Sequence, residues 1–227
     1  MFTETVTTYE AKRGVETFNS RYAEMERALW CLSRAAVESL TASQPAQVID
    51  ELVWTIKSWW GIQGVRKETK SAAAQALIDL RLDRDLLKPA SRLDPNGVKV
   101  AVDLVSRFVD GMMRLGVSRR EWSLASKTLH WLMPWRVPVY DSFVKKSLCI
   151  SVNAEHKSAY WSIVRAEFEA AQRLLQESDD WLGDIEPRSP FRALDKYLWW
   201  SAGGDADTAT VVKDPWRVIR MLGIEAR

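Results

Sequence analysis

Residues Ser126 to Lys146 read SKTLHWLMPWRVPVYDSFVKK, and the interpretation of the fold depends on this stretch. Lys127 and the His130–Trp131 pair lie on a predicted helix, which ends in a bend bounded by two prolines. Asp141 then opens a second predicted helix. The stretch is either a packing corner whose aspartate caps a helix, or an enzyme centre built from a lysine and an aspartate.

The composition is typical of a soluble globular chain. Of 227 residues, 47% are hydrophobic and 27% are charged, which suits one large domain or two lobes sharing a core. No apolar run approaches the roughly 20 residues that span a bilayer, and the N-terminal MFTETVTTYEAKRG lacks the apolar core of a signal peptide. Cys31 and Cys149 lie far apart and only two histidines are present, so we predict no metal site. Free thiols in a reducing, cytoplasmic setting are expected.

Positive charge gathers around the opening stretch. Residues 117–146 hold six basic and two acidic residues, a local excess of four positive charges, whereas the net charge of the whole chain is only +2. A local basic face suits a phosphate backbone, but a run of charges is also the ordinary composition of a solvated surface. Both interpretations stay open at this point.

Apolar residues recur with a period near 3.6 through most of the chain, which predicts an all-α fold of about nine helices. The expected helices cover 16–41, a segment restarting at Ser43–Pro45, 70–80, Asp94–Pro95 to Gly116, a segment from a capping box at Ser118–Glu121 to Pro134, 141–150, 154–177, 189–202 and 214–222. Most of the 12 tryptophans are expected in the core, and several could line a pocket for a flat ligand.

Asp141 and Lys127 each have a structural and a functional interpretation. Aspartate is a preferred N-cap, and the helix N-terminus favours an ionised carboxylate while the apolar neighbours of Asp141 oppose it. Lys127 falls at the edge of the apolar stripe of its helix, where the pattern predicts a solvent-exposed ammonium with its stem along apolar surface. A nucleophilic lysine would instead need to be buried.

The order of these elements resembles the helix-hairpin-helix DNA glycosylases. A long helix, a tight hairpin and a helix carrying a lysine precede a loop and the segment PVYDSFV, residues 138–144. This segment is similar to the one that carries the catalytic aspartate of the family, and EWSLASK, residues 121–127, stands at the hairpin. The resemblance covers about thirty residues closely and residues 96–147 loosely, with Ser123 and Ala125 where the family has glycines.

The resemblance implies a two-lobed helical bundle with a cleft between the lobes. Residues 1–227 would form one helical domain, in which 94–150 is the hairpin and catalytic core and the N- and C-terminal helices form the rest. It further implies a monomeric DNA N-glycosylase without a cofactor, which flips a modified or damaged base out of double-stranded DNA and leaves an abasic site. Asp141 would stabilise the cationic sugar, and Lys127 would attack it, with strand nicking, or hold a phosphate.

Other site residues follow from the same resemblance. The expected residues of the base pocket are Trp122, His130, Trp131, Trp135 and Tyr140, and those of the DNA-backbone grip are Arg119, Arg120, Lys145 and Lys146. The absent hairpin glycines and the many tryptophans suit an unusual target, such as a glucosylated base of phage DNA. The alternatives are a non-catalytic nucleic-acid-binding domain and a protein-interaction module.

Overall fold

The computed structural model describes residues 6–42, 47–59, 67–88, 93, 96–151, 153–204 and 212–225. Over these ranges the chain forms nine α-helices, one short 3-10 helix and no strand, so the all-α prediction is confirmed. The helices are α2 (Thr8–Ala42), α3 (Gln47–Trp59), α4 (Lys67–Asp79), α5 (Gly97–Arg114), α6 (Trp122–Leu132), α7 (Ser142–Ser147), α8 (His156–Glu177), η1 (Asp180–Leu182), α9 (Pro190–Ser201) and α10 (Arg217–Met221). None of these helices has the length and apolar character needed to cross a bilayer.

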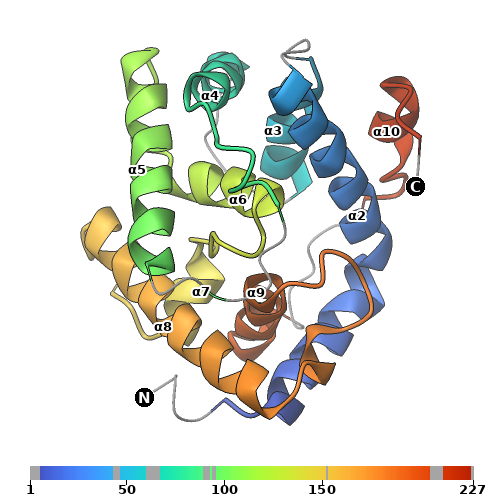
Figure 1. The fold of residues 1–227 in the computed structure, drawn as a ribbon, viewed down its shortest axis with the longest axis vertical. Coiled ribbons are helices and arrows are strands. Elements are labelled where there is room, and N and C mark those ends of the chain that lie inside the picture. Colours follow the sequence, from blue (N-terminus) through green and yellow to red (C-terminus); the bar gives the residue numbers. More distant parts are fainter. Residues whose placement is uncertain are drawn as a thin grey trace.

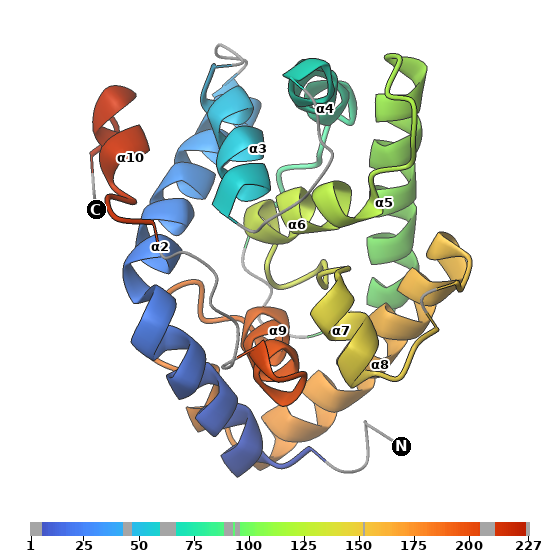
Figure 2. The same ribbon diagram turned by 180° about the vertical axis from the view of Figure 1, so that it is seen from behind.

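Helices α6, α7 and α9 lie in the middle of the molecule, with α2 on one side and α5 and α8 on the other (Figures 1 and 2). Helix α9 packs against α2, α7 and α8, and α6 packs against α2, α3 and α5. The approach of α2 to α9 is close, because a Cβ on Gly14 would lie only 2.7 Å from the Cα of Tyr197. Elements from both ends of the chain therefore meet around α6 and α9.

Helix α2 begins earlier than the apolar periodicity indicates. The structure starts it at Thr8 rather than near residue 16, and a capping box closes its first turn. The hydroxyl of Thr7 accepts from the Glu10 amide (3.2 Å), while the Glu10 carboxylate accepts from the Thr7 amide (3.0 Å). The start of α2 was predicted from apolar residues, and its first turns are mostly polar.

The prediction of a capping box at Ser118–Glu121 is wrong. Helix α6 begins at Trp122, its N-cap is Glu121, and the Glu121 side chain makes no capping hydrogen bond. Instead, the Glu121 carboxylate pairs with the guanidinium of Arg119, which lies two residues earlier. Because that carboxylate pairs with a cation, it does not reach back to Ser118. Residues 118–119 form a bend, and residues 120–121 are irregular rather than helical.

Of two other helix boundaries, the start of α9 agrees with the prediction and the end of α7 does not. Helix α9 starts as expected, with the Ser189 hydroxyl accepting from the Arg192 amide (3.1 Å) and Pro190 as the first helical residue. Helix α7 ends at Ser147 rather than at residue 150, and Cys149 adopts the left-handed region with φ 53°. The expected starts at Ser43–Pro45 and Asp94–Pro95 lie outside the described residues.

Candidate active site

Asp141 is the N-cap of α7, as the structural interpretation predicted. Its backbone is extended, and its Oδ1 accepts from the Val144 amide at 2.9 Å. Hydrogen bonds from two helices fix the loop that precedes Asp141. The Ser126 hydroxyl of α6 accepts from the Tyr140 amide (2.9 Å), and the Tyr160 hydroxyl of α8 donates to the Pro138 carbonyl (2.9 Å). The position of Asp141 is therefore set by the packing of α6 and α8, as well as by its own helix.

Lys127 approaches the other oxygen of the same carboxylate. Its Nζ lies 3.3 Å from Asp141 Oδ2, and only 12% of the Lys127 side chain and 18% of the Asp141 side chain are exposed. The pattern predicted a solvent-exposed lysine, and that prediction is wrong. Helix α6 packs against α2, α3 and α5, so a position at the edge of its apolar stripe is still covered. The fold thus brings together the two residues that the resemblance assigned to catalysis.

A buried ionic cluster lies on α9 and α2. The Arg192 guanidinium pairs with the carboxylates of Glu26 and Asp195, and the Lys196 ammonium lies 3.1 Å from Glu26. All four residues are at most 8% exposed. Arg192 also lies over the ring of Trp131, with its Cζ 5.3 Å from the ring centroid. Such a cluster is stable only as a whole, since removal of one partner leaves a buried charge unpaired.

Two further buried carboxyl groups, Asp195 and Glu167, interact electrostatically with Asp141. Burial raises the pKa of Asp195 to about 6, against the lowering effect of the Arg192 cation and with a contribution from the charge of Asp141. Burial also raises the pKa of Glu167 on α8 well above its usual value, with the charges of Asp195 and Asp141 adding to the effect. Neither oxygen of Glu167 has a hydrogen-bond partner among the described residues. Burial therefore favours the neutral form of the Glu167 carboxyl group.

Sequence analysis missed these carboxylates, although a signal was present. Phe191, Leu194 and Leu198 mark the apolar stripe of α9, and Asp195 occupies the same stripe. Glu167 falls in the buried stripe of α8, and Glu26 falls in that of α2. A carboxylate inside an apolar stripe indicates a buried partner or a functional site.

His130 is buried in the core, where one ring nitrogen is bonded. Its Nδ1–H donates to the Val137 carbonyl at 2.6 Å, which leaves Nε2 unprotonated and without a partner among the described residues. Burial, and next the nearby Arg192 cation, lower the pKa of His130 to about 3. The imidazole is therefore neutral and helps to fix the bend before Asp141.

The predicted aromatic residues are not gathered in one place. Trp122, Tyr140 and Tyr160 pack together with ring centroids 5.9 to 6.4 Å apart, and the three rings are at most 4% exposed. Trp131 is 2% exposed and packs against Arg192, whereas the partly buried Trp135 packs against Trp30 of α2 (5.8 Å). In this structure Trp122, Trp131 and Tyr140 are therefore part of the protein core.

The predicted DNA-backbone residues fall into two groups. Arg119 and Arg120 are exposed on the turn between α5 and α6, and Arg119 is paired with Glu121. Lys145 and Lys146 lie on α7, next to the candidate site. The Lys145 ammonium lies 5.2 Å from the centroid of the Tyr140 ring, and the Lys146 ammonium donates to the Ala202 carbonyl (2.7 Å).

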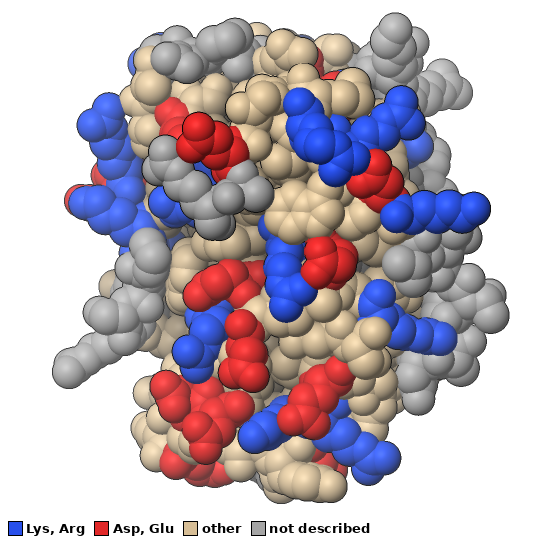
Figure 3. Space-filling model, turned by 90° about the vertical axis from the view of Figure 1, so that its right-hand side faces the viewer, with Lys and Arg blue, Asp and Glu red and all other residues tan. Residues whose placement is uncertain are grey.

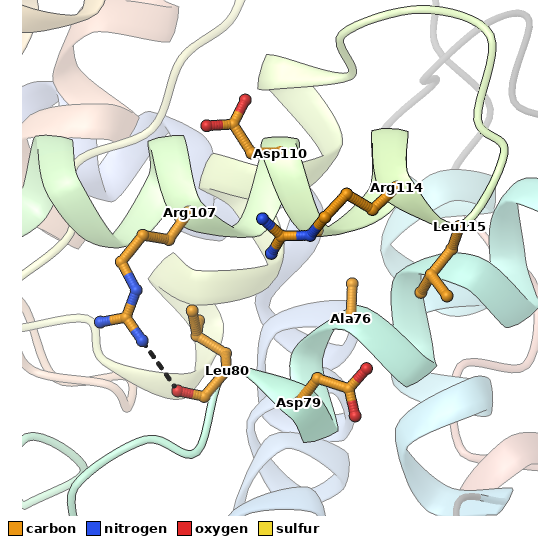
Figure 4. Close-up of a pocket in the computed structure, with 8 residues that line it drawn as sticks. Ala76, Asp79, Leu80, Arg107, Asp110, Arg114 and Leu115 are labelled. Atoms are coloured by element: carbon orange, nitrogen blue, oxygen red, sulfur yellow. Dashed lines mark hydrogen bonds between the residues drawn. The ribbon is translucent and has the colours of Figure 1, made fainter.

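Two cavities among the described residues lie apart from the Lys127–Asp141 pair. One, of about 270 Å³, lies between α4 and α5, where Arg107 donates to the Leu80 carbonyl (3.3 Å; Figure 4). The other, of about 850 Å³, is lined by α2, by residues 184–186 and by residues that flank α10, and it includes Trp30 and Trp216. Acidic and basic residues intermingle on the face that carries α10 (Figure 3). Neither cavity has a lining of one charge sign.

A comparison of the chain with protein families, curated proteins and solved structures finds no match to any of them. The described residues also contain no cluster of histidine, cysteine, aspartate or glutamate with the geometry of a metal site. The chemistry of the candidate site is therefore argued from its own residues.

Proposed function

We propose that this chain is a DNA N-glycosylase that excises a modified or damaged base. The observation that carries the proposal is the ion pair of Lys127 Nζ and Asp141 Oδ2, 3.3 Å apart and largely buried. A paired lysine and aspartate at a helix N-terminus, on a loop fixed by neighbouring helices, has the preorganisation that catalysis needs. The resemblance of residues 121–144 to helix-hairpin-helix glycosylases supports the same chemistry.

Asp141 supplies the negative charge in this proposal. As the bond between the base and C1′ breaks, the base leaves with the electron pair and the sugar becomes cationic. The Asp141 carboxylate stabilises that cation and accepts a proton from the attacking water or amine. The bond from the Val144 amide holds Oδ1 in place, while Oδ2 faces Lys127.

Lys127 has two roles open to it. After losing a proton it can attack C1′ as the base leaves. The C1′–O4′ bond then breaks while a proton passes from the amine nitrogen to O4′, which gives a protonated imine, and elimination of the 3′-phosphate from this imine cleaves the strand. Alternatively, Lys127 can remain an ammonium and bind a phosphate. Arg119, Arg120 and Lys145 would bind the DNA backbone and make binding depend on salt. The proposed substrate class is double-stranded DNA with a modified base, including the glucosylated cytosines of phage genomes.

The test is an abasic-site assay on phage and host genomic DNAs that carry different base modifications. Wild type is compared with Asp141→Asn, which removes the charge but retains a good N-cap, and borohydride traps any imine at Lys127. The exposed Glu169, which pairs with Arg165, supplies the control Glu169→Gln. Abasic sites made by wild type and the control, and reduced at least about 100-fold in Asp141→Asn, are expected. Equal product from wild type and Asp141→Asn, or no abasic sites on any DNA, contradicts the proposal.

The burial of Trp122 and Trp131 favours a second candidate, a helical domain that binds nucleic acid without chemistry. Its tryptophans would be structural, and its affinity would come from exposed cations. This candidate predicts salt-dependent DNA binding by wild type and Asp141→Asn alike, and no abasic sites.

A further inference from the structure

The larger of the two cavities, of about 850 Å³, lies where α2 meets residues 184–186 and the residues that flank α10. Helices α2 and α10 pack together at one edge of the molecule (Figures 1 and 2). The volume is within the range of pockets that hold small-molecule ligands. None of the described lining residues belongs to the Lys127–Asp141 pair, so the proposed base excision does not use this cavity.

Two partly buried tryptophans give the cavity an apolar, aromatic lining. Trp30 of α2 packs against Trp135, with ring centroids 5.8 Å apart. The indole N–H of Trp216 donates to the Glu24 carboxylate at 2.8 Å. Both indoles are therefore anchored to their neighbours. Because the N–H of Trp216 is already bonded, a ligand would contact the ring of this tryptophan and not its donor.

The charged residues that line the cavity are exposed, and carboxylates outnumber cations among the described ones. The carboxylates are those of Glu38, Asp184, Glu186 and Glu225, and the cations are Arg27 and Arg34. The charge of Arg27 is offset by an ion pair with Glu24, which does not line the cavity. The Arg34 guanidinium lies over the ring of Trp30, with its Cζ 5.8 Å from the ring centroid. The lining therefore carries an excess of negative charge around rings that attract cations.

We propose that this cavity binds a small organic cation with a flat apolar body, of the amidine or guanidine class. The apolar body packs against the indoles of Trp30 and Trp216, and the carboxylates of Glu38 and Asp184 balance the charge of the cation. The contact between Arg34 and Trp30 shows that this ring accepts a delocalised cation. An anionic ligand, such as a nucleotide, would be repelled by the excess of carboxylates. The inference is independent of the proposed glycosylase function.

Three probes of nearly the same shape separate the effect of charge from that of shape. They are benzamidine, a cation, benzamide, which is neutral, and benzoate, an anion. Each probe is titrated into the isotopically labelled full chain at low salt, and NMR follows the indole N–H signals of Trp30 and Trp216, which Trp30→Phe and Trp216→Phe identify. We expect benzamidine to shift both signals and to bind at least about fivefold more tightly than benzamide, with benzoate the weakest. Equal affinities for benzamidine and benzamide, or no shift of either signal, overturn the inference.

Substitutions of exposed charged residues around the cavity should change the affinity for benzamidine in opposite directions. Glu38→Gln and Asp184→Asn each remove a negative charge and should weaken binding about two- to fivefold, whereas Arg34→Gln removes a positive charge and should strengthen it by a similar factor. The control Glu169→Gln removes an exposed carboxylate on α8, away from the cavity, and should leave the affinity unchanged. Weaker binding in Arg34→Gln, or wild-type affinity in both carboxylate variants, overturns the inference.

Discussion

At the scale of single residues, Asp141 divides its two carboxylate oxygens between two tasks. Oδ1 closes the first turn of α7, and Oδ2 pairs with Lys127. The structural and the functional interpretations of this aspartate are therefore compatible. They can be separated by substitutions that remove one property at a time.

The contribution of the α7 N-cap to the free energy of unfolding can be measured by comparing Asp141→Asn with Asp141→Ala. Both variants leave Lys127 without its ion pair, but only alanine removes the acceptor for the Val144 amide. We expect Asp141→Ala to unfold with about 1 kcal/mol less stability than Asp141→Asn, as measured by urea denaturation. Equal stabilities of the two variants would mean that the capping bond contributes nothing.

His130 should make the folded state sensitive to acid. The pKa of this buried imidazole is about 3, against 6.5 for an ordinary histidine, so between these values the unfolded chain binds more protons than the folded one. Stability contributed by neutral His130 is complete above pH 6.5 and is lost as the pH falls toward 3. At about 1.4 kcal/mol per unit of pKa difference, the loss is on the order of 5 kcal/mol.

The check is the free energy of unfolding from pH 7 to pH 4 in wild type and in His130→Gln. Glutamine does not titrate, so the variant should lose less stability on acidification. Parallel curves for wild type and His130→Gln would contradict the buried neutral state of His130.

The identity of the site residues was only partly predictable from sequence. Asp141 could be found because a proline-bounded bend and a helix start both point to it. Lys127 was chosen through a resemblance, and its burial beside Asp141 could not be predicted, because it depends on the neighbours of α6. Three carboxyl groups lie inside apolar helix stripes, those of Asp195, Glu167 and Glu26. A prediction that divides residues only into polar and apolar places such residues on the surface.

At the scale of elements, α9 contributes Arg192, Asp195 and Lys196 within five consecutive residues, all of them buried. Replacement of Arg192 by methionine leaves Glu26 charged and buried without this partner, and we expect a loss of about 3 to 5 kcal/mol. The matched control is Arg165→Met, which breaks the exposed Arg165–Glu169 pair on α8 and should cost less than about 1 kcal/mol. Similar losses in the two variants, measured by urea denaturation, would show that the cluster does not stabilise the fold.

Helix starts were predicted where the local residues alone decide them. Ser189 and Pro190 begin α9 because a hydroxyl and a fixed proline φ need no distant partner. Thr7–Glu10 and Ser118–Glu121 share one capping pattern, yet only the first is a capping box. The pairing of Glu121 with Arg119 makes the difference, and the four-residue pattern does not consider that competing cation.

At the scale of the whole molecule, the central position of α9 predicts cooperative unfolding. Helix α9 packs against α2 near the N-terminus, against α7 within the 94–150 segment, and against α8, which follows that segment (Figure 2). Neither the N-terminal nor the central helices retain their core without it. We expect one calorimetric transition whose measured enthalpy equals its van't Hoff enthalpy. Two separate transitions would show that residues 94–150 form an independent lobe.

The bond from the Val144 amide to Asp141 also offers a reporter on the site. That hydrogen is protected from solvent exchange only while the first turn of α7 is wound and the aspartate is in place. Each opening of this turn releases the Asp141 carboxylate, which is then no longer held beside Lys127. The exchange rate of a single backbone hydrogen thus reads out the fraction of time for which the centre is assembled, before any substrate is known.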